Sequence, residues 1–256
     1  MPGRNSNVET TEVELTARLQ RLAIAAADLV MPGMLVGLGT GSTADAVTRE
    51  LGRRVADGLV FTAVPTSDRT EALARDLGIP LSTLDETTRL DLGIDGADEI
   101  DLALDAIKGR GGALLREKLV ALSCDDYVLV ATTEKSVDQL GARTPLPIEI
   151  VAFGWSQTAK RLASIGIAAE PRTVDDEPAR LWVTDSGGII VDCATGPIND
   201  SSQLATAIKA VSGVVEHGLF LGIARTALQV DAEGRVVRRE RTGLESRNCR
   251  LWSDVS

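Results

Sequence analysis

The chain has 256 residues, 44% hydrophobic and 25% charged, which is enough for one large domain, or one domain with a smaller companion, around a sizeable core. Its formal net charge of −10, with no cluster of Lys and Arg outside Arg235–Arg241, argues against nucleic-acid binding. Three scattered cysteines and one histidine, His217, provide almost no ligands for a transition-metal site, so we expect none.

The N-terminal part predicts a tail, a helix and a buried strand. Polar residues 1–10 are expected to be a disordered tail, and apolar residues at helical spacing from Leu15 to Val30 predict a helix. The apolar stretch Leu22–Leu38 is interrupted by Asp28 and Pro32, which argues against a membrane span. Because no secretory signal is visible either, we expect a cytoplasmic protein with no membrane partner.

Short apolar strands then alternate with helices as far as about residue 143. This alternation predicts an α/β fold, a doubly wound Rossmann-like parallel sheet, with a second, smaller α+β domain inserted near the C-terminal half. The strands are expected at Met34–Leu38, Leu59–Val64, Leu90–Ile94 and Tyr127–Ala131, and the helices at Ala44–Leu51, Ser67–Leu77 and Ala113–Leu122.

The pattern changes near Thr144-Pro145-Leu146-Pro147. Residues 144–213 are expected to form the smaller domain, and residues 11–143 and 214–256 the Rossmann-like domain. Asp185–Gly188 predicts a hairpin turn within the smaller domain. The remaining expected elements are the strands Ile148–Phe153, Leu181–Thr184 and Ile189–Asp192, the helices Trp155–Ser164 and Gln203–Val211, and the strands Val214–Ile223, Ala227–Asp231 and Val236–Arg239, which are expected to return to the first sheet.

Gly39-Thr40-Gly41-Ser42-Thr43 lies between a predicted strand and a predicted helix. Glycines let the backbone approach a ligand closely, and a helix start offers unpaired N–H groups and a partial positive charge. Phosphate is the natural ligand of such a turn, although a plain strand–helix turn with Ser42 or Thr43 as its cap fits the residues about as well. The turn is neither a P-loop nor a dinucleotide-binding fingerprint.

Two further motifs follow predicted strands or open a predicted helix. Asp95-Gly96-Ala97-Asp98 offers two carboxylates that could move protons among hydroxyl groups, or could simply bond their own turn. Lys108-Gly109-Arg110-Gly111-Gly112 could present N–H groups and a cation to an oxyanion, with Glu117 one to two turns into the next helix. Taken alone, Glu117 fits a solvated helix face better than a catalytic role. A lone loop residue such as Lys135 is more often a surface charge than a ligand contact.

Taken together and in this order, the motifs resemble those of type A ribose-5-phosphate isomerases. The similarity runs from about Leu15 to Arg239. It rests on Gly39–Ala44, Asp95–Ile100, Lys108–Lys118, Pro145–Glu149 and Gly213–Phe220.

The resemblance implies interconversion of ribose 5-phosphate and ribulose 5-phosphate through an enediol, without metal or cofactor. It implies that Glu117 is the base, that Asp95 and Asp98 handle sugar hydroxyls and ring opening, and that Lys108 stabilises the enediolate. It also implies a homodimer or homotetramer. The implied substrate-binding residues are Thr40, Gly41, Ser42, Thr43, Asp95, Gly96, Ala97, Asp98, Lys108, Gly109, Arg110, Gly111 and Lys135.

Several positions depart from the family pattern and keep alternatives open. Arg110 stands where the family normally has glycine, and Leu115 stands where it commonly has threonine. Leu19 and Gln20 stand where the family often places a phosphate-contacting lysine, and Ser67–Thr70 is also unusual. Arg110 could replace that lysine, since its guanidinium matches phosphate geometry. The alternatives are a paralogous isomerase of another phosphosugar and a non-catalytic sugar-phosphate sensor; a nucleotide-dependent dehydrogenase is a weaker one.

Overall fold

The structure is a computed structural model that describes residues 5–87, 89–174 and 177–241. The helices are α1 (Asn5–Ala27), α2 (Ser42–Ala56), α3 (Asp68–Asp76), α4 (Leu114–Leu122), α5 (Trp155–Ser164) and α6 (Ser201–Lys209), with 3₁₀ turns at Leu84–Glu86 and Thr133–Lys135. The strands are β1 (Leu35–Leu38), β2 (Thr62–Pro65), β3 (Leu90–Gly96), β4 (Glu99–Ile100), β5 (Ala106–Ile107), β6 (Cys124–Thr132), β7 (Leu146–Ile150), β8 (Ala169–Pro171), β9 (Thr173–Val174), β10 (Glu177–Leu181), β11 (Ile189–Cys193), β12 (Val214–His217), β13 (Leu219–Phe220), β14 (Thr226–Val230) and β15 (Val236–Glu240).

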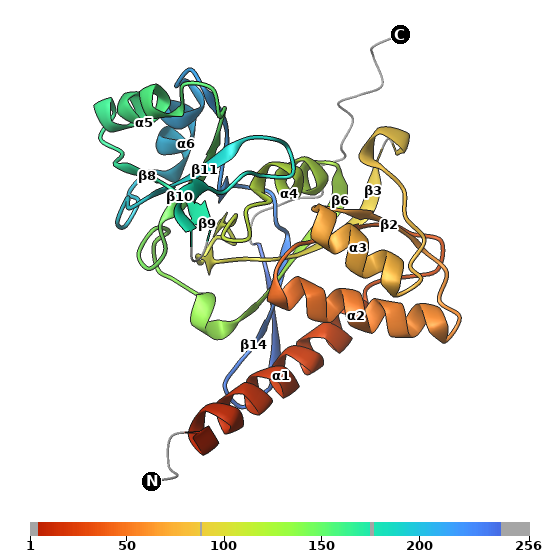
Figure 1. The fold of residues 1–256 in the computed structure, drawn as a ribbon. Coiled ribbons are helices and arrows are strands. Elements are labelled where there is room, and N and C mark those ends of the chain that lie inside the picture. The colour runs from red at the N-terminus through yellow and green to blue at the C-terminus, as the bar shows by residue number, and fades with distance from the viewer. Residues whose placement is uncertain (1–4, 88, 175–176, 242–256) are drawn as a thin grey trace.

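A six-stranded sheet with the order β15-β14-β6-β3-β1-β2 forms the centre of the larger part of the molecule (Figure 1). All neighbouring strands are parallel except β15, which is antiparallel to β14. The α/β fold with a mainly parallel sheet is therefore confirmed.

Helices cover both faces of this sheet because successive residues of a strand point to opposite sides. Along β6, Val128 and Val130 pack in the cluster that contains α1, α2 and α3, whereas Leu129 and Ala131 pack in a second cluster with Ala121 of α4. Such nearly continuous apolar strands are typical of parallel sheets that are buried on both faces.

The smaller part contains a four-stranded antiparallel sheet with the order β12-β7-β11-β8. Helices α5 and α6 pack on it around a core of their own. The smaller α+β unit near the C-terminal half is thus confirmed.

Strand β12 corrects one prediction. We expected Val214–Ile223 to return to the first sheet, but β12 pairs with β7 in the smaller sheet, and β13 pairs with β5 in a separate three-stranded sheet. Only β14 and β15 return to the large sheet. The domain limits stay a prediction, with residues 11–143 and 214–256 in the larger domain and residues 144–213 in the smaller one. The pairing of β12 with β7 would assign β12 to the smaller domain.

Two local expectations also differ from the structure. Helix α1 begins at Asn5, inside the expected tail, because polar residues can extend a helix without an apolar face that would reveal it. The turn at Asp185–Gly188 forms, with the Thr184 N–H donating to the Gly188 carbonyl, but the strand before it, β10, pairs with β9. Within the described residues, no helix has the length and apolarity needed to cross a membrane.

The predicted motifs come together because β1, β3 and β6 are parallel neighbours. Their carboxyl ends lie at one edge of the sheet, where Gly39–Thr43 follows β1, Lys135 follows β6, and Asp95–Asp98 spans the end of β3. Gly39 is required at this edge, since a Cβ there would lie 2.6 Å from the Cα of Asp95. The close approach of β1 and β3 therefore positions the candidate site.

Candidate active site

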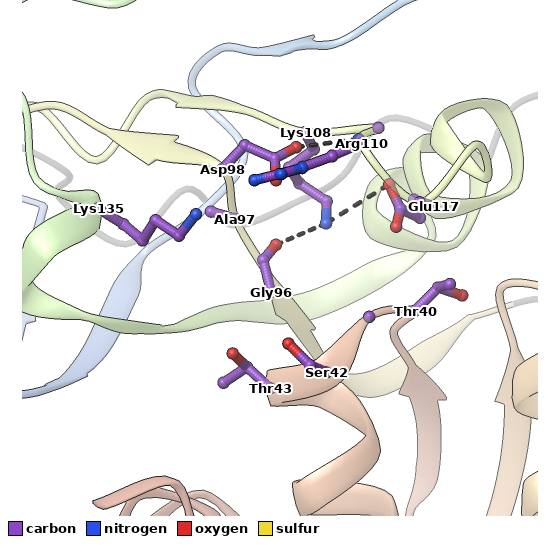
Figure 2. Close-up of a pocket in the computed structure, with 13 residues that line it drawn as sticks. Thr40, Ser42, Thr43, Gly96, Ala97, Asp98, Lys108, Arg110, Glu117 and Lys135 are labelled. Carbon is purple, nitrogen blue, oxygen red and sulfur yellow. Dashed lines mark hydrogen bonds and ion pairs between the residues drawn. The ribbon is translucent and has the colours of Figure 1, made fainter. Parts of the chain in front are cut away.

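A cavity of about 290 Å³ opens at this edge of the sheet. In Figure 2 the turn that carries Ser42 and Thr43 lies on one side, and Asp98, Lys108 and Arg110 lie on the opposite side. Nearly all the predicted site residues line it. They are Thr40, Gly41, Ser42, Thr43, Gly96, Ala97, Asp98, Lys108, Gly109, Arg110, Gly111, Glu117 and Lys135.

The first turn of α2 faces this cavity. Gly41 is the N-cap, and among the described residues no side chain caps the helix. The N–H groups at its start are therefore available to an anion, and the helix dipole adds a partial positive charge. The hydroxyls of Ser42 and Thr43 lie at the same end of the helix (Figure 2).

The hydroxyl of Thr40 is directed differently. Its Oγ1 lies 2.8 Å from the hydroxyl of Thr66, 2.7 Å from that of Ser67 and 3.0 Å from that of Thr70, all buried. Ser67 in turn caps α3 by accepting a hydrogen bond from the Thr70 N–H. The cluster ties the turn before α2 to the start of α3, which keeps the anion-facing backbone in place.

Lys108 is the buried cation of the site, with 2% of its surface exposed. Its Nζ donates to the Gly96 carbonyl at 2.6 Å and lies 3.0 Å from Oδ2 of Asp95 and 3.5 Å from Oε2 of Glu117. Burial lowers the pKa of Lys108, but the carboxylates of Asp95 and Glu117 outweigh it and raise this pKa above its usual value. The ammonium therefore stays charged at the cavity wall.

Asp95 is the one predicted site residue that does not line the cavity. It lies behind Lys108, 1% exposed, and accepts hydrogen bonds from the N–H groups of Thr40 and Gly96 and from the hydroxyl of Tyr127. The geometry makes it the support of Lys108 and of the anion-facing turn.

Glu117 is buried on α4 with 2% of its surface exposed. Burial raises its pKa to about 8, although the charge of Lys108 acts in the opposite direction. Oε2 of Glu117 has no hydrogen-bond partner among the described residues. A buried carboxyl with a raised pKa and a free oxygen, at a cavity wall, is arranged as a general base.

The loop after Lys108 is held from both sides. The Arg110 N–H donates to Oδ2 of Asp98 at 3.0 Å, while the Arg110 side chain is exposed and lines the cavity. Arg172, which lies between β8 and β9, donates to the carbonyls of Gly109 and Arg110, and it forms an ion pair with Asp192. The smaller unit therefore fixes the shape of this loop.

Several supporting residues were not found from the sequence. Tyr127, Arg172 and Phe220 stand alone in their strands or loops, and their contacts come from distant parts of the chain. Phe220 was the easiest to find, since it ends the Gly213–Phe220 segment that carries part of the family resemblance. His217 is buried, and its Nδ1 accepts a hydrogen bond from the Leu219 N–H.

Comparison with known proteins agrees with this geometry. The family model of ribose 5-phosphate isomerase A (phosphoriboisomerase A) matches residues 62–234. Ribose-5-phosphate isomerase A of Roseiflexus castenholzii is 50% identical over 219 residues, which cover 85% of this chain and 93% of the relative. The chain belongs to the ribose 5-phosphate isomerase A family.

Solved structures of this family have the same fold. Ribose 5-phosphate isomerase from Plasmodium falciparum superposes with a TM-score of 0.84 at 37% identity, covering 89% of this chain and 99% of that one. A D-ribose-5-phosphate isomerase in complex with phospho-erythronic acid gives a TM-score of 0.83 at 32% identity, covering 88% and 98%. The fold of these solved family members therefore covers nearly the whole of this chain.

Two further observations concern the phosphate-contacting lysine of the family and the possibility of a metal site. Neither Leu19 nor Gln20 lines the cavity; Gln20 instead donates to Glu50 of α2. In the part of the chain that the structure describes, no group of three or more His, Cys, Asp or Glu side chains is arranged to hold a metal ion.

Proposed function

We propose that this chain interconverts ribose 5-phosphate and ribulose 5-phosphate, with Glu117 as the general base. The observation that carries the proposal is the buried Glu117 carboxyl, 3.5 Å from the Lys108 ammonium, at the wall of a cavity whose other side is an uncapped helix start. A base, a cation and an anion cradle are the three groups that isomerisation of a phosphosugar needs.

The phosphate group fits the start of α2. Its N–H groups, with the hydroxyls of Ser42 and Thr43, are donors suited to a dianion. Arg110 and Lys135 add positive charge at the cavity. Arg110 compensates in this way for the lysine that the family often has near Leu19, and its fork-shaped guanidinium suits phosphate.

The groups that would transfer the proton lie on the side of the cavity opposite the start of α2. Glu117 removes the proton from C2 of the open-chain aldose, the electrons form the C1–C2 double bond, and the negative charge develops on O1. Lys108 stabilises this charge, Glu117 returns the proton to C1, and the proton of the O2 hydroxyl passes to O1, which leaves a ketone at C2 and a hydroxyl group at C1. Asp98, half-buried at the wall, is positioned to carry protons between the sugar oxygens, and Asp95 holds Lys108 in place.

An assay of ketose formation tests the proposal. The purified chain should convert ribose 5-phosphate to ribulose 5-phosphate without added metal, and should convert unphosphorylated ribose far more slowly. A panel of other aldose phosphates separates this activity from that of a paralogue with another phosphosugar. Binding of ribose 5-phosphate in calorimetry with no turnover would instead indicate a sensor and would refute the proposal.

The pH dependence follows from the pKa of Glu117. A base acts as its carboxylate, so kcat/KM should rise as the pH increases through about 8, the pKa of this group. Because burial favours the protonated form, the contribution of Glu117 to the free energy of unfolding is complete below its usual pKa of 4.5 and is lost as the pH rises through about 8. A kcat/KM profile whose acid side instead falls near pH 4.5 would contradict a buried base.

We also propose that the protein acts in the cytoplasm as a homodimer or homotetramer. The family resemblance supports the assembly. Sedimentation analysis at several protein concentrations measures the assembly, and a monomer at every concentration would refute it.

A further inference from the structure

Two buried lysines lie over one aromatic ring. The Nζ of Lys108 is 5.4 Å from the centroid of the Phe220 ring, and the Nζ of Lys118 is 5.0 Å from it. Phe220 is 2% exposed, Lys108 2% and Lys118 7%. At such distances, and away from water, the negative face of the ring attracts an ammonium group.

The ring supplies stabilisation that Lys108 cannot obtain from water. A buried ammonium is costly unless its charge is compensated. The Lys108 ammonium contacts oxygen atoms of Asp95, Glu117 and the Gly96 carbonyl. Asp98 adds a more distant negative charge. The face of Phe220 is a further electrostatic contact of this ammonium, and an aliphatic side chain of similar size would fill the space without providing it.

The backbone determines where the ring lies. Phe220 of β13 pairs with Ala106 of β5, and the Lys108 N–H donates to the Gly218 carbonyl at 2.9 Å. Gly218 is required here because a Cβ would lie 2.2 Å from the Lys108 carbonyl oxygen. The paired backbone segments thus hold the ring and the lysine next to each other.

Lys118 is anchored from the same segment. Its Nζ donates to Oε1 of Glu216 at 2.8 Å and to the His217 carbonyl at 2.5 Å. It follows Glu117 directly on α4, so the contacts of Lys118 with residues 216–220 also fix the part of the helix that carries the base. The Phe220 ring therefore contacts the Lys108 ammonium and also Lys118, the lysine that anchors the part of α4 carrying Glu117.

We propose that Phe220 is a positioning residue for the isomerase: its ring holds the Lys108 ammonium at the site where negative charge develops on the sugar. The inference rests on the proposed function, in which Glu117 is the base and Lys108 the oxyanion-stabilising group. Phe220 does not touch the sugar itself, because it does not line the cavity. Its effect on the reaction is exerted through Lys108.

Fluorination of the ring tests this role. Each added fluorine weakens the negative face while changing the shape little, so phenylalanine at residue 220 is replaced by its mono-, di- and trifluorinated analogues. We expect kcat for ribose 5-phosphate to fall stepwise, with log kcat linear in the calculated cation-binding energy of the ring, and KM to change little. Phe220→Leu should lower kcat by roughly 3- to 30-fold, the range that corresponds to one cation–π contact.

Phe61 provides the matched control, since it is 1% exposed and packs in the cluster on the α1 side of the sheet, away from Lys108. The same fluorinated series at residue 61 should leave kcat unchanged. A flat series at residue 220, with Phe220→Leu lowering only the melting temperature, would show that the ring serves packing alone and would overturn the inference.

The Glu117→Gln variant separates this failure from failure of the proposed function. If Glu117→Gln is inactive and the series at residue 220 is flat, only the role of Phe220 is wrong. If Glu117→Gln is as active as the unaltered chain, the proposed mechanism is wrong, and the inference is overturned with it.

Discussion

Glu117→Gln should lower kcat for ribose 5-phosphate by about 10²- to 10⁴-fold, the usual contribution of a positioned general base. Glutamine keeps the size of the side chain, but its amide cannot accept the C2 proton. KM should change little, because the phosphate is bound at the start of α2 on the other side of the cavity. Steady-state kinetics measured well above pH 8, where the carboxylate is ionised in the unaltered chain, give the largest contrast.

Glu233→Gln is the control for this substitution, since the Glu233 side chain is 66% exposed in a turn remote from the cavity. It should leave kcat and KM unchanged. Glu117→Gln removes a charge 3.5 Å from the Lys108 ammonium, so the melting temperature of the variant is measured beside kcat to establish that it is folded. A folded Glu117→Gln variant with full activity would exclude Glu117 as the base.

Lys108→Met should lower kcat by about 10²- to 10³-fold, the loss typical when one oxyanion-stabilising donor is removed. Methionine keeps the length of the side chain but leaves the enediolate without its cation. It also leaves Asp95 as a buried carboxylate without its charged partner, which should reduce the free energy of unfolding by about 3–5 kcal/mol. Urea denaturation and steady-state kinetics measure the two effects separately.

A second substitution distinguishes chemistry from stability. Adding Asp95→Asn to Lys108→Met removes the unpaired carboxylate, so the double variant should regain part of the lost stability while kcat stays low. Lys209→Met is the matched control, because Lys209 pairs with Glu216 at 3.1 Å but is 46% exposed; its effect on unfolding should be within about 1 kcal/mol. If the double variant regained activity along with stability, Lys108 would be a structural residue only.

The sequence was most informative where local chemistry and strand order agree. The turn at Gly39–Thr43, the Asp95–Asp98 pair and Lys135 each lie at the carboxyl end of a strand, and parallel pairing brings such strand ends to one edge. No local pattern distinguished Glu117 from its charged neighbours on α4, and only the family resemblance selected it. Its burial comes from the packing of α4 against the sheet, which a linear pattern does not contain.

What the sequence could not predict depends on contacts between distant segments. The four residues of β12, Val214–His217, do not indicate which sheet the strand joins, and only its pairing with β7 places it in the smaller one. Asp95 and Asp98 looked equivalent as a pair of turn carboxylates, yet Asp95 is buried beneath Lys108 while Asp98 lines the cavity. Asp95 lies within β3 and accepts a hydrogen bond from Tyr127 of the neighbouring strand, whereas Asp98 lies beyond the end of β3.

Asp95 also connects the two halves of the site. One carboxylate receives the Thr40 N–H, from the turn that faces the phosphate, and holds the ammonium of Lys108. The distance between the start of α2, which faces the phosphate, and the Lys108 ammonium is therefore set by the Asp95 side chain. This distance selects the number of carbons in the sugar. A phosphosugar with one carbon more or fewer between its phosphate and its carbonyl would seat one end correctly and misplace the other by about 1 Å or more, a displacement that can cost about 10²-fold in rate.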